Sequence, residues 1–306
     1  MAPTFHIRSI GGILCTITGN HSWRLSDIKA AVEEASGIPQ REQRFICGTA
    51  EVHDLDDCLG KDLTLIRRPP AQAEWLERVA ADGLDLANAP SSIQADHEVV
   101  SVAVRSHGFA LQHAARELRG DQSVVSAAVN SHGFALQYAS DHLRADRDMV
   151  KAAVRSNGFA LEFAADELRS DREIFLSAVS MHGYLLKHAS EKLRGDKEIV
   201  LAAVRSHGFA LQYASRPLRG DRELVLGALQ SHGCALEYAS LELRADRDLV
   251  LAAVRSHGHA LEFASEALRG DVEVVRATIM SHPYALWLYA SKELQSDPTL
   301  LRLAQH

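Results

Sequence analysis

Residues 196–220 read DKEIVLAAVRSHGFALQYASRPLRG, and this 25-residue unit recurs along most of the 306-residue chain. The aspartate that opens each copy falls at a fixed spacing, at Asp96, Asp121, Asp146, Asp171, Asp196, Asp221, Asp246 and Asp271. Such self-similarity is the signature of a stacked repeat protein, in which each unit buries its apolar face against its neighbours. The sequence therefore predicts a helical solenoid, an architecture that serves as a binding surface or as a spacer.

We number each unit from its aspartate as position 1, and call the units repeats 1–8. Position 1 precedes a helical pattern and is expected to cap a helix, whose buried face is formed by the apolar positions 4, 5, 8 and 9. Position 13 is glycine except for Pro283 in repeat 8, and we expect a left-handed turn there. A second, shorter helix is predicted to carry positions 14, 16, 18 and 19. Each repeat thus reads as two helices that cannot fold alone.

Histidine at position 12 and arginine at position 24 recur in the repeats, but their spacing matches no catalytic or metal-binding motif. Neighbouring helices pack about 8–10 Å apart, whereas zinc–nitrogen bonds are about 2 Å, so the histidine row predicts no metal site. We interpret these histidines as helix C-terminal residues that bond the last carbonyls, and the arginines as a structural ladder along one edge. No cofactor is expected.

Positions 6 and 10 vary between repeats, which makes them more informative about binding. Position 6 is leucine in repeats 4–7, and position 10 is arginine in every second repeat, so that the candidate partner-binding residues are Arg155, Leu176, Leu201, Arg205, Leu226, Leu251 and Arg255. Since both positions lie on one helix face, they could line a groove for an acidic, hydrophobic peptide. Alternatively, position 6 lies in the seam between helices and belongs to the core.

The first 70 residues have a different pattern. Residues 4–10 and 13–18 are alternating, β-branched runs on either side of Gly11-Gly12, which is typical of a β-hairpin. Residues 25–35 have a helical period, with Gly37 able to end the helix. Residues 44–47 and 63–67 are two further short strands. The predicted order is β-β-α-β-β.

This segment resembles ubiquitin over about 65 residues, on the hairpin, on residues 37–48 (GIPQREQRFICG) and on residues 63–68 (LTLIRR). The resemblance implies a β-grasp fold whose apolar, partner-binding patch would comprise Ile10, Ile46 and Ile66. The alternative is that these isoleucines fill the core of the small domain. Ubiquitin ends in a flexible Gly-Gly tail, whereas here Arg67-Arg68 runs into Pro69-Pro70, so we expect no conjugation.

Residues 74–95 match the following unit at a spacing of 25 and read as a degenerate capping repeat, since an end unit buries only one face. The predicted organisation is a β-grasp domain at 1–70, a short linker at 71–73, this capping repeat, eight helical repeats at 96–296 and a C-terminal cap at 297–306. The fold class is therefore α+β, a small β-grasp domain joined to a large all-α solenoid. The array resembles a family of tandem helical repeats, the domain of unknown function 4116, which implies an α-solenoid and no activity.

Charge and composition restrict the partners. The net charge is −7, and Lys and Arg number 25 against 31 Asp and Glu in residues 74–306, which argues against nucleic acid as a partner. We see no apolar run that would predict a signal peptide or a membrane span, and the four cysteines lack metal or disulfide spacing. We expect a cytoplasmic monomer, with the nucleus as an alternative location.

No nucleophile elbow, phosphate loop or zinc-hydrolase helix occurs in the sequence. We therefore expect a non-enzymatic scaffold that binds proteins, ubiquitin-pathway components among them. Two alternatives are an RNA-binding repeat protein, which would need a basic face, and a structural spacer.

Overall fold

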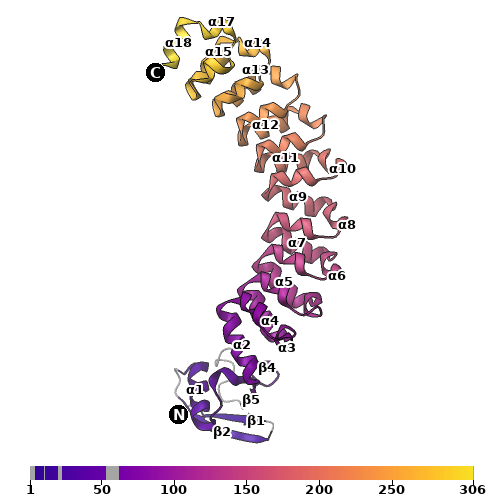
Figure 1. Ribbon diagram of the computed structural model, residues 1–306, viewed down its shortest axis with the longest axis vertical. Coiled ribbons are helices and arrows are strands. Elements are labelled where there is room, and N and C mark those ends of the chain that lie inside the picture. Colours follow the sequence, from indigo (N-terminus) through magenta and orange to yellow (C-terminus); the bar gives the residue numbers. More distant parts are fainter. Residues whose placement is uncertain (1–3, 10, 20–22, 53–61, 306) are drawn as a thin grey trace. The chain divides into compact units, whose positions relative to one another are not determined.

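The computed structural model describes residues 4–9, 11–19, 23–52 and 62–305 (Figure 1). The chain divides into two compact units, residues 1–127 and residues 128–306, which we call the N-terminal and C-terminal units and describe separately. Ile10 and Cys58 lie outside the described residues.

The N-terminal unit begins with a five-stranded mixed sheet. Its elements are β1 (Thr4–Ser9), β2 (Gly12–Thr18), the helix α1 (Leu25–Ser36), the 3-10 turn η1 (Gln40–Glu42), β3 (Gln43–Cys47), β4 (Ala50–Glu51) and β5 (Leu63–Arg67). The strand order is β2-β1-β5-β3-β4, with β1 and β5 parallel at the centre. This is a β-grasp fold and confirms the predicted one, with the short β4 in addition.

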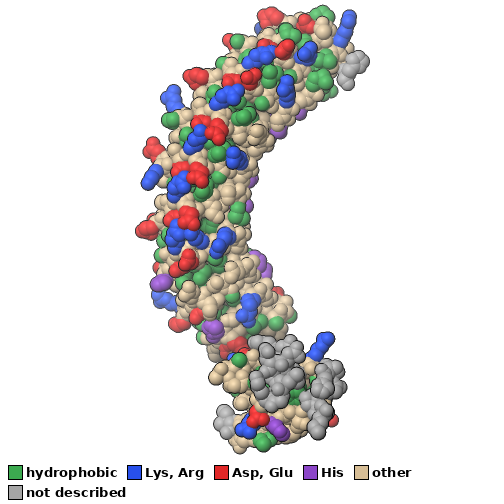
Figure 2. All heavy atoms as spheres, turned by 180° about the vertical axis from the view of Figure 1, so that it is seen from behind, with side chains coloured by type: hydrophobic (Ala, Val, Ile, Leu, Met, Phe, Trp, Pro, Cys, Tyr) green, Lys and Arg blue, Asp and Glu red, His purple; other side chains and the backbone are tan. Residues whose placement is uncertain are grey.

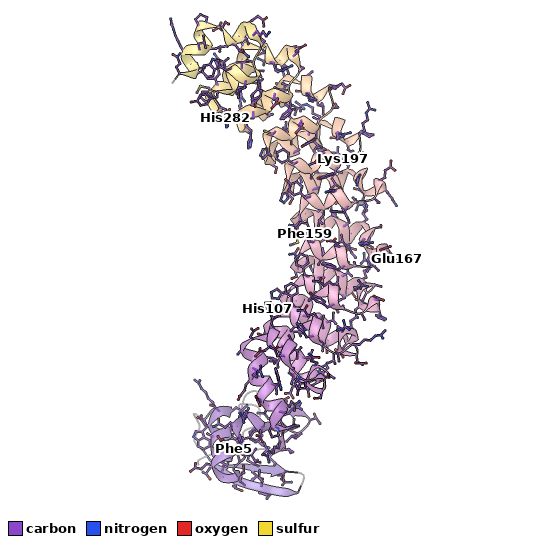
Figure 3. The ribbon with its side chains drawn as sticks, in the orientation of Figure 1. Phe5, His107, Phe159, Glu167, Lys197 and His282 are labelled. Carbon is purple, nitrogen blue, oxygen red and sulfur yellow. The ribbon has the colours of Figure 1, made fainter. Side chains whose placement is uncertain are left out.

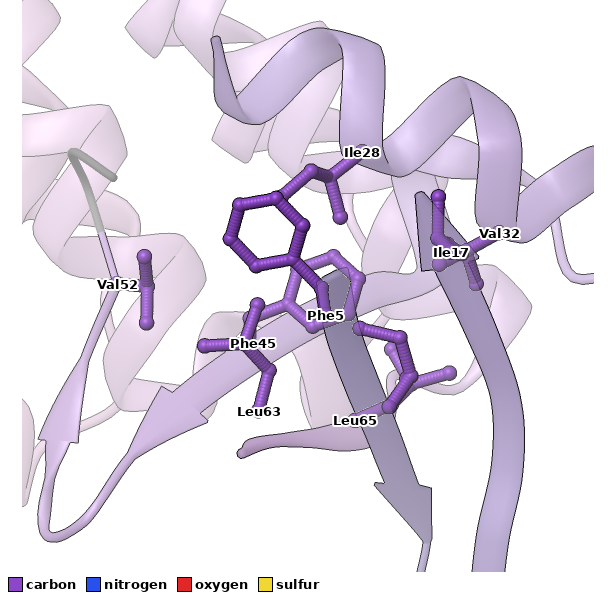
Figure 4. Packing of buried hydrophobic residues seen from close by; sticks show 9 residues of the cluster. Phe5, Ile17, Ile28, Val32, Phe45, Val52, Leu63 and Leu65 are labelled. Carbon is purple, nitrogen blue, oxygen red and sulfur yellow. The ribbon is translucent and has the colours of Figure 1, made fainter. Parts of the chain in front are cut away.

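One face of the sheet packs on α1 and forms the small core of this domain. Phe5, Ile7, Phe45 and Leu65 alternate along the strands and meet Ile28 of α1 (Figure 4). Alternation places the residues between them on the other face of the sheet. The domain therefore has one buried and one outward face.

The β-grasp domain runs directly into a helix. Residues 71–73, expected as a linker, lie within α2 (Pro70–Ala81), which Pro70 can begin because the first helical N–H needs no intrahelical partner. The 3-10 helix η3 (Gly83–Asn88) and the short α3 (Ser91–Gln94) follow. These elements have the same order as those of the later repeats.

Each repeat begins with a ten-residue helix over positions 2–11. These helices are α4 (His97–Ser106), α5 (Gln122–Ser131), α7 (Arg147–Ser156), α9 (Arg172–Met181), α11 (Lys197–Ser206), α12 (Arg222–Ser231), α13 (Arg247–Ser256) and α15 (Val272–Ser281). The aspartate at position 1 accepts a backbone N–H as predicted; Asp196, for example, caps α11 through the N–H groups of Glu198 and Ile199. Positions 4, 5, 8 and 9 are buried, as in Ile199, Val200, Ala203 and Val204.

The second element is a 3-10 helix over positions 13–18 rather than a short α-helix. It comprises η4 (Gly108–His113), η6 (Gly133–Tyr138), η7 (Gly158–Phe163), η8 (Gly183–His188), η9 (Gly208–Tyr213), η11 (Gly233–Tyr238) and η13 (Gly258–Phe263), and only in repeat 8 is it replaced by α16 (Ala285–Tyr289). Its tighter winding changes the buried face. Positions 15, 16 and 19 are buried, whereas positions 14 and 18, expected in the core, are half-buried or exposed in repeat 5 and its neighbours.

A single helical turn closes each repeat. These turns are η5 (Leu118–Gly120), α6 (Asp141–Arg144), α8 (Asp166–Arg169), α10 (Glu191–Arg194), η10 (Leu218–Gly220), η12 (Leu243–Ala245), α14 (Glu266–Arg269) and α17 (Lys292–Gln295), and α18 (Pro298–Ala304) follows the last repeat. Within the C-terminal unit the repeats stack in sequence order (Figure 1).

Glycine at position 13 has a different role from the one predicted. Among the described residues only Gly12, Gly37 and Gly48 have positive φ, so position 13 makes no left-handed turn. Instead, a Cβ placed on Gly208 would lie 2.5 Å from the carbonyl oxygen of Ala228 in the next repeat. The corresponding distances at Gly133, Gly183 and Gly233 are 2.6, 2.2 and 2.5 Å. Glycine is therefore needed because the backbones of successive repeats approach closely.

We predict that Gly208→Ala destabilises the protein by about 1–3 kcal/mol, because the added methyl group must displace a packed backbone. Equilibrium urea unfolding followed by circular dichroism measures the change. Gly220→Ala is the matched control, since its Cβ would lie 3.7 Å from Ser240 and neither glycine has a positive φ. Equal effects of the two substitutions would show that the close approach is not what requires glycine.

Candidate interaction surfaces

A ladder of ion pairs links successive repeats of the C-terminal unit. The basic residue at position 2 pairs with the acidic residues at positions 1 and 3 of the next repeat. In one rung Arg172 contacts Asp196 at 2.7 Å and Glu198 at 2.5 Å. The other rungs are Arg147 with Asp171 and Glu173, Lys197 with Asp221 and Glu223, Arg222 with Asp246 and Asp248, and Arg247 with Asp271 and Glu273. We call this set the charge ladder.

The ladder that we expected from arginine at position 24 therefore runs through position 2. Position 24 contributes mainly through its main chain, since the carbonyl of Arg194 accepts the N–H of Ser215 at 2.9 Å and that of Arg219 accepts the N–H of Ser240 at 2.9 Å. The Arg244 side chain also donates to the carbonyl of Phe263 in the next repeat. Both sets of contacts bind one repeat to the next.

The charge ladder alters the titration of its members. Hydrogen bonds from Lys151 and Arg147 lower the pKa of Glu173 to about 2. The hydrogen bond from Arg172 lowers the pKa of Asp196, and the hydrogen bonds that Lys197 donates to Asp221 and Glu223 raise the pKa of Lys197. These acidic and basic side chains therefore bind one repeat to the next through charged hydrogen bonds.

A column of imidazole and aromatic rings follows another edge of the C-terminal unit. We call the rings at positions 12 and 14 of repeats 3–8 the ring column. Figure 3 shows two of its members, Phe159 and His282, on the edge opposite to Glu167 and Lys197. Phe159 stacks on His182 with ring centroids 4.5 Å apart. The position 14 ring of one repeat thus lies on the position 12 ring of the next.

Three histidines of this column accept a hydrogen bond from the glycine N–H at position 13 of the preceding repeat. The N–H of Gly183 donates to Nδ1 of His207 at 3.2 Å, and the same contact joins Gly233 to His257 and Gly258 to His282. Because Nδ1 accepts, the neutral ring carries its proton on Nε2. These histidines therefore fasten repeats together rather than bonding the last carbonyls of their own helix, as we had expected.

Serine at position 11 makes the same contact in other repeats. Ser156 and Ser231 accept the N–H of Gly133 and Gly208, each at 3.0 Å. At Gly133, Gly183, Gly208, Gly233 and Gly258 the position 13 N–H is thus held by the following repeat, through either serine or histidine.

We call positions 6 and 10 of repeats 3–8 the stripe. Its predicted arginines, Arg155, Arg205 and Arg255, are exposed, and none of the described carboxylates lies within ion-pair distance of them. The predicted leucines, which are Leu176, Leu201, Leu226 and Leu251, are half-buried. A Cβ on Gly227 would lie 3.5 Å from Leu201, so this leucine faces the seam with α12 and still reaches the surface.

One cavity lies on the stripe between α13 and α15. It has a volume of about 290 Å³ and is lined by Leu251, Arg255, Glu273, Arg276, Ala277 and Met280. Four of these six residues occupy positions 6 and 10 of two successive repeats. Figure 2 shows hydrophobic side chains interspersed with charged ones along the visible face of the C-terminal unit. The stripe therefore combines apolar surface with unpaired guanidinium groups.

In repeat 1 the same helix face holds the β-grasp domain. Arg68, 12% exposed, bonds Glu98 at position 3 of α4 at 2.6 Å and Glu51 of β4 at 3.1 Å. A cavity of about 400 Å³ is lined by Lys29, Arg44 and Arg68 on one side and by Glu98, Val102 and Arg105 of α4 on the other, with Leu25, Gln43, Phe45, Glu51 and Val52 completing it. Thus, within the N-terminal unit, positions 3, 7 and 10 of a repeat face a folded domain.

The predicted β-grasp patch is described only in part. Ile46 and Ile66 both lie on the outward sheet face, because Phe45 and Leu65 beside them are buried. Ile46 is half-buried and Ile66 is 43% exposed. Ile10 lies outside the described residues. The two isoleucines occupy neighbouring strands, where Ile46 pairs with Thr64 and Ile66 with Arg44.

Among the described residues no group of three or more His, Cys, Asp or Glu side chains could hold a metal ion. The described cysteines, Cys15, Cys47 and Cys234, are half-buried and form no disulfide. Within the same part of the chain, no helix has the length and apolar character needed to span a membrane.

These features define the class of the protein, a β-grasp domain joined to a solenoid of short helical repeats. The model of a domain of unknown function (DUF4116) matches residues 121–169, 171–219, 197–244, 221–269 and 246–295, more than half of the chain, and the chain belongs to this family. A search of curated proteins and a search of solved structures each returned no match.

Sequence reasoning missed several contributors to these surfaces. Arg276 and Met280 complete the cavity beside Leu251, yet they break the leucine and arginine pattern that defined the prediction. Arg68 was noted only for ending the ubiquitin-like segment, because its partner Glu98 is 30 residues away. The ring column was hidden because position 14 had been assigned to the core.

We predict that Glu173→Gln reduces the acid sensitivity of the protein. The folded pKa of about 2 lies below the ordinary value of 4.5, so ionised Glu173 contributes stability that is complete above about pH 4.5 and is lost as the pH falls toward 2. The variant should therefore melt at a lower temperature than the parent protein at pH 7, and the two should converge toward pH 2–3.

Thermal melts between pH 2.5 and pH 7 at low salt provide the measurement, since salt screens exposed pairs. Asp148→Asn is the matched control, because Asp148 also occupies position 3 and forms no ion pair with any described residue. Parallel melting curves for Glu173→Gln and the parent would contradict the ladder's role.

Proposed function

We propose that this protein is a non-enzymatic interaction scaffold whose stripe binds an acidic, hydrophobic segment of a partner protein. The observation that carries the proposal is that the equivalent helix of repeat 1 already contacts a folded domain, through the ion pair of Glu98 with Arg68 and around a cavity that Val102 and Arg105 help to line. In repeats 3–8 this face is open and carries arginines without a carboxylate among the described residues. A helix that contacts a folded domain in one repeat is suited to contact a partner in the others, there with arginine rather than glutamate as the charged group.

The chemistry of the stripe favours such a partner. A guanidinium group binds a carboxylate through two parallel hydrogen bonds, which gives direction as well as energy. The half-buried leucines between the arginines offer apolar area to Leu, Ile or Phe side chains. Because arginine recurs in every second repeat, an extended segment would meet alternating apolar and basic sites.

A binding function is also supported by the use of the recurring polar residues. Aspartate at position 1 caps a helix, position 2 forms the charge ladder and histidine at position 12 fastens two repeats. A catalytic site needs one constellation of activated groups, whereas these groups are each engaged repeatedly in structural contacts. The predicted arginines and leucines of the stripe take part in none of these contacts.

RNA binding and a purely spacing role are the alternatives. The stripe arginines favour RNA, but the charge ladder places carboxylates at position 3, one helical turn before position 6, and the net charge is −7. A spacer would bind nothing along the stripe. The following experiment distinguishes RNA binding and a spacer role from peptide binding.

We predict that Arg155→Glu, Arg205→Glu and Arg255→Glu, combined, abolish selection of acidic peptides by the full-length protein. A random peptide library displayed on phage would be selected on the parent protein, and we expect enrichment of Asp or Glu beside Leu, Ile or Phe. Selected peptides should bind the triple variant at least about tenfold more weakly, since each paired guanidinium is replaced by a like charge.

The matched control replaces three exposed basic residues outside the stripe, Lys187, Lys192 and Arg216, by glutamate. It produces the same change in net charge and should leave binding unchanged. Equal losses in both triple variants would contradict a specific stripe. Enrichment of no peptide, or salt-dependent binding of oligouridine by the parent but not by the triple variant, would favour the spacer or the RNA reader, respectively.

For the β-grasp domain we propose recognition by proteins that read ubiquitin-like domains. We predict that Ile66→Glu weakens binding of a ubiquitin-binding helical domain by about tenfold or more, because a charge would be buried in an apolar contact. Isothermal titration calorimetry on the full chain measures this. Ala30→Glu, which adds the same charge to an exposed position of α1, should bind as the parent does; absence of binding by the parent itself would refute the recognition.

A further inference from the structure

The ring column is interrupted in repeat 6. Position 14 carries a ring in the other repeats of the C-terminal unit, at Phe159, Tyr184, Phe209, His259 and Tyr284, but in repeat 6 it is Cys234. The cysteine is half-buried and forms no disulfide. One ring is therefore missing from the edge at this point.

The stacking of the neighbouring rings changes around Cys234. Before the interruption, the position 12 histidine lies on the position 14 ring of the preceding repeat. His232, for example, lies on Phe209 with ring centroids 4.3 Å apart. In repeat 7, His257 has no such ring and instead stacks on His232 at 4.0 Å. The column resumes at His259, which lies 5.2 Å from His282. Position 14 of repeat 6 thus carries no ring, whereas position 14 of the repeats on either side does.

Two carboxylates lie close to this interruption. Glu237 follows Cys234 by three residues in the 3-10 helix η11, which puts the two on one face of it. Burial raises the pKa of the Cys234 thiol, and the charges of Glu237 and Glu262 raise it further. Both glutamates are exposed, and no described Lys or Arg forms an ion pair with either of them. Position 17, which they occupy, is Lys187 and Gln212 in the two repeats before and Glu162 in repeat 3, so only repeats 6 and 7 carry glutamate at this position in two successive repeats.

Aromatic surface continues from this point into repeat 8. Tyr289 lies 5.9 Å from His259, and its hydroxyl hydrogen-bonds Glu262. Repeat 8 is one residue longer than the others, its second element is the α-helix α16, and Tyr284, Trp287 and Leu288 are 77%, 40% and 62% exposed. The rings of Tyr284 and Trp287 lie 6.1 Å apart. Exposed apolar rings of this kind usually mark an interaction site.

We propose that this aromatic-acidic face, formed by Cys234, Glu237, His259, Glu262, Tyr284 and Trp287, binds a peptide segment through an arginine side chain placed beside Cys234. A guanidinium group can stack on an aromatic or imidazole ring while its N–H groups donate to carboxylates. Rings and carboxylates both lie here within one or two repeats. Because repeat 6 has no ring at position 14, the incoming guanidinium group would take the place of that ring. The partner is thus a basic segment with apolar residues that cover Trp287 and Leu288.

This surface is separate from the stripe and has the opposite charge preference. The stripe offers arginines to an acidic segment, whereas the aromatic-acidic face offers carboxylates to a basic one. The glutamates at position 17 come from the 3-10 elements η11 and η13, while the stripe belongs to the long helices. Each proposal can therefore fail without the other.

The experiment measures binding of a fluorescein-labelled peptide, GRGRGRLW, to the full-length protein by fluorescence anisotropy. The combined substitution Glu237→Gln and Glu262→Gln should weaken binding at least about tenfold, because two charge-assisted contacts are lost. A peptide with citrulline in place of arginine should bind the parent weakly, since it keeps the planar shape and loses the charge. Cys234→Phe, which restores a ring at position 14, should weaken binding of the arginine peptide as well.

Glu162→Gln is the matched control, because Glu162 occupies the same position 17 in repeat 3, where Phe159 completes the column. It should bind as the parent does, and so should the triple stripe variant. Melting temperatures of all variants exclude loss of folding as the cause. Equal weakening by Glu162→Gln, or equal affinity for the citrulline peptide, would overturn the proposal, because it would show attraction by overall charge or apolar contact alone.

Discussion

The structure depends on how closely the backbone of one repeat approaches that of the next. At position 13 the approach leaves no space for a Cβ, as the 2.5 Å separation from Gly208 to the carbonyl oxygen of Ala228 shows. The N–H of the same glycine is held by the following repeat, through serine at position 11 or histidine at position 12. The van der Waals contact at this glycine sets the distance between successive repeats. The hydrogen bond of its N–H sets their relative orientation. Because it recurs, the stability of the array is a sum of nearest-neighbour terms.

That constraint explains which polar residues are available for function. The cap at position 1 satisfies N–H groups of its own helix, whereas the charge ladder at positions 1–3 and the acceptors at positions 11 and 12 satisfy groups at the interface between repeats. Residues at positions 6, 10, 14 and 17 vary, and their chemistry changes from one repeat to another, although Leu201 still faces the seam and Phe159 still stacks on His182. Arg255 beside Leu251 and Glu262 beside His259 therefore provide different surfaces on the same frame.

The sequence predicted the repeat, its first helix and the β-grasp domain, because each has a strong period or a local signal, such as the alternation around Phe5 and Ile7. It did not predict the 3-10 form of the second element, since a six-residue segment such as 208–213 is too short to distinguish a period of 3 from one of 3.6. That error moved position 14 into the expected core and concealed the ring column. The role of Gly208 was also missed, because glycine at a helix end has a common conformational explanation and its true cause lies in Ala228, 20 residues away. For the stripe, periodicity placed Leu201 and Arg205 on one face but could not show that Arg276 and Met280 complete the cavity.

Substitutions that depart from the repeat pattern are informative about function where the stacking of the repeats continues unchanged. Stacking through positions 8 and 11–13 continues past Cys234, where Gly233 still donates to His257 and still lies against Ala253. In repeat 8, by contrast, Pro283 replaces the glycine and removes its N–H, and the second element becomes α-helical with one additional residue. A substitution at position 14 thus costs little in stacking, whereas one at position 13 is accompanied by a change of structure. Variation at position 14 can therefore follow the requirements of a partner, and this tolerance is the physical basis for proposing a binding role for Cys234 and the two carboxylates.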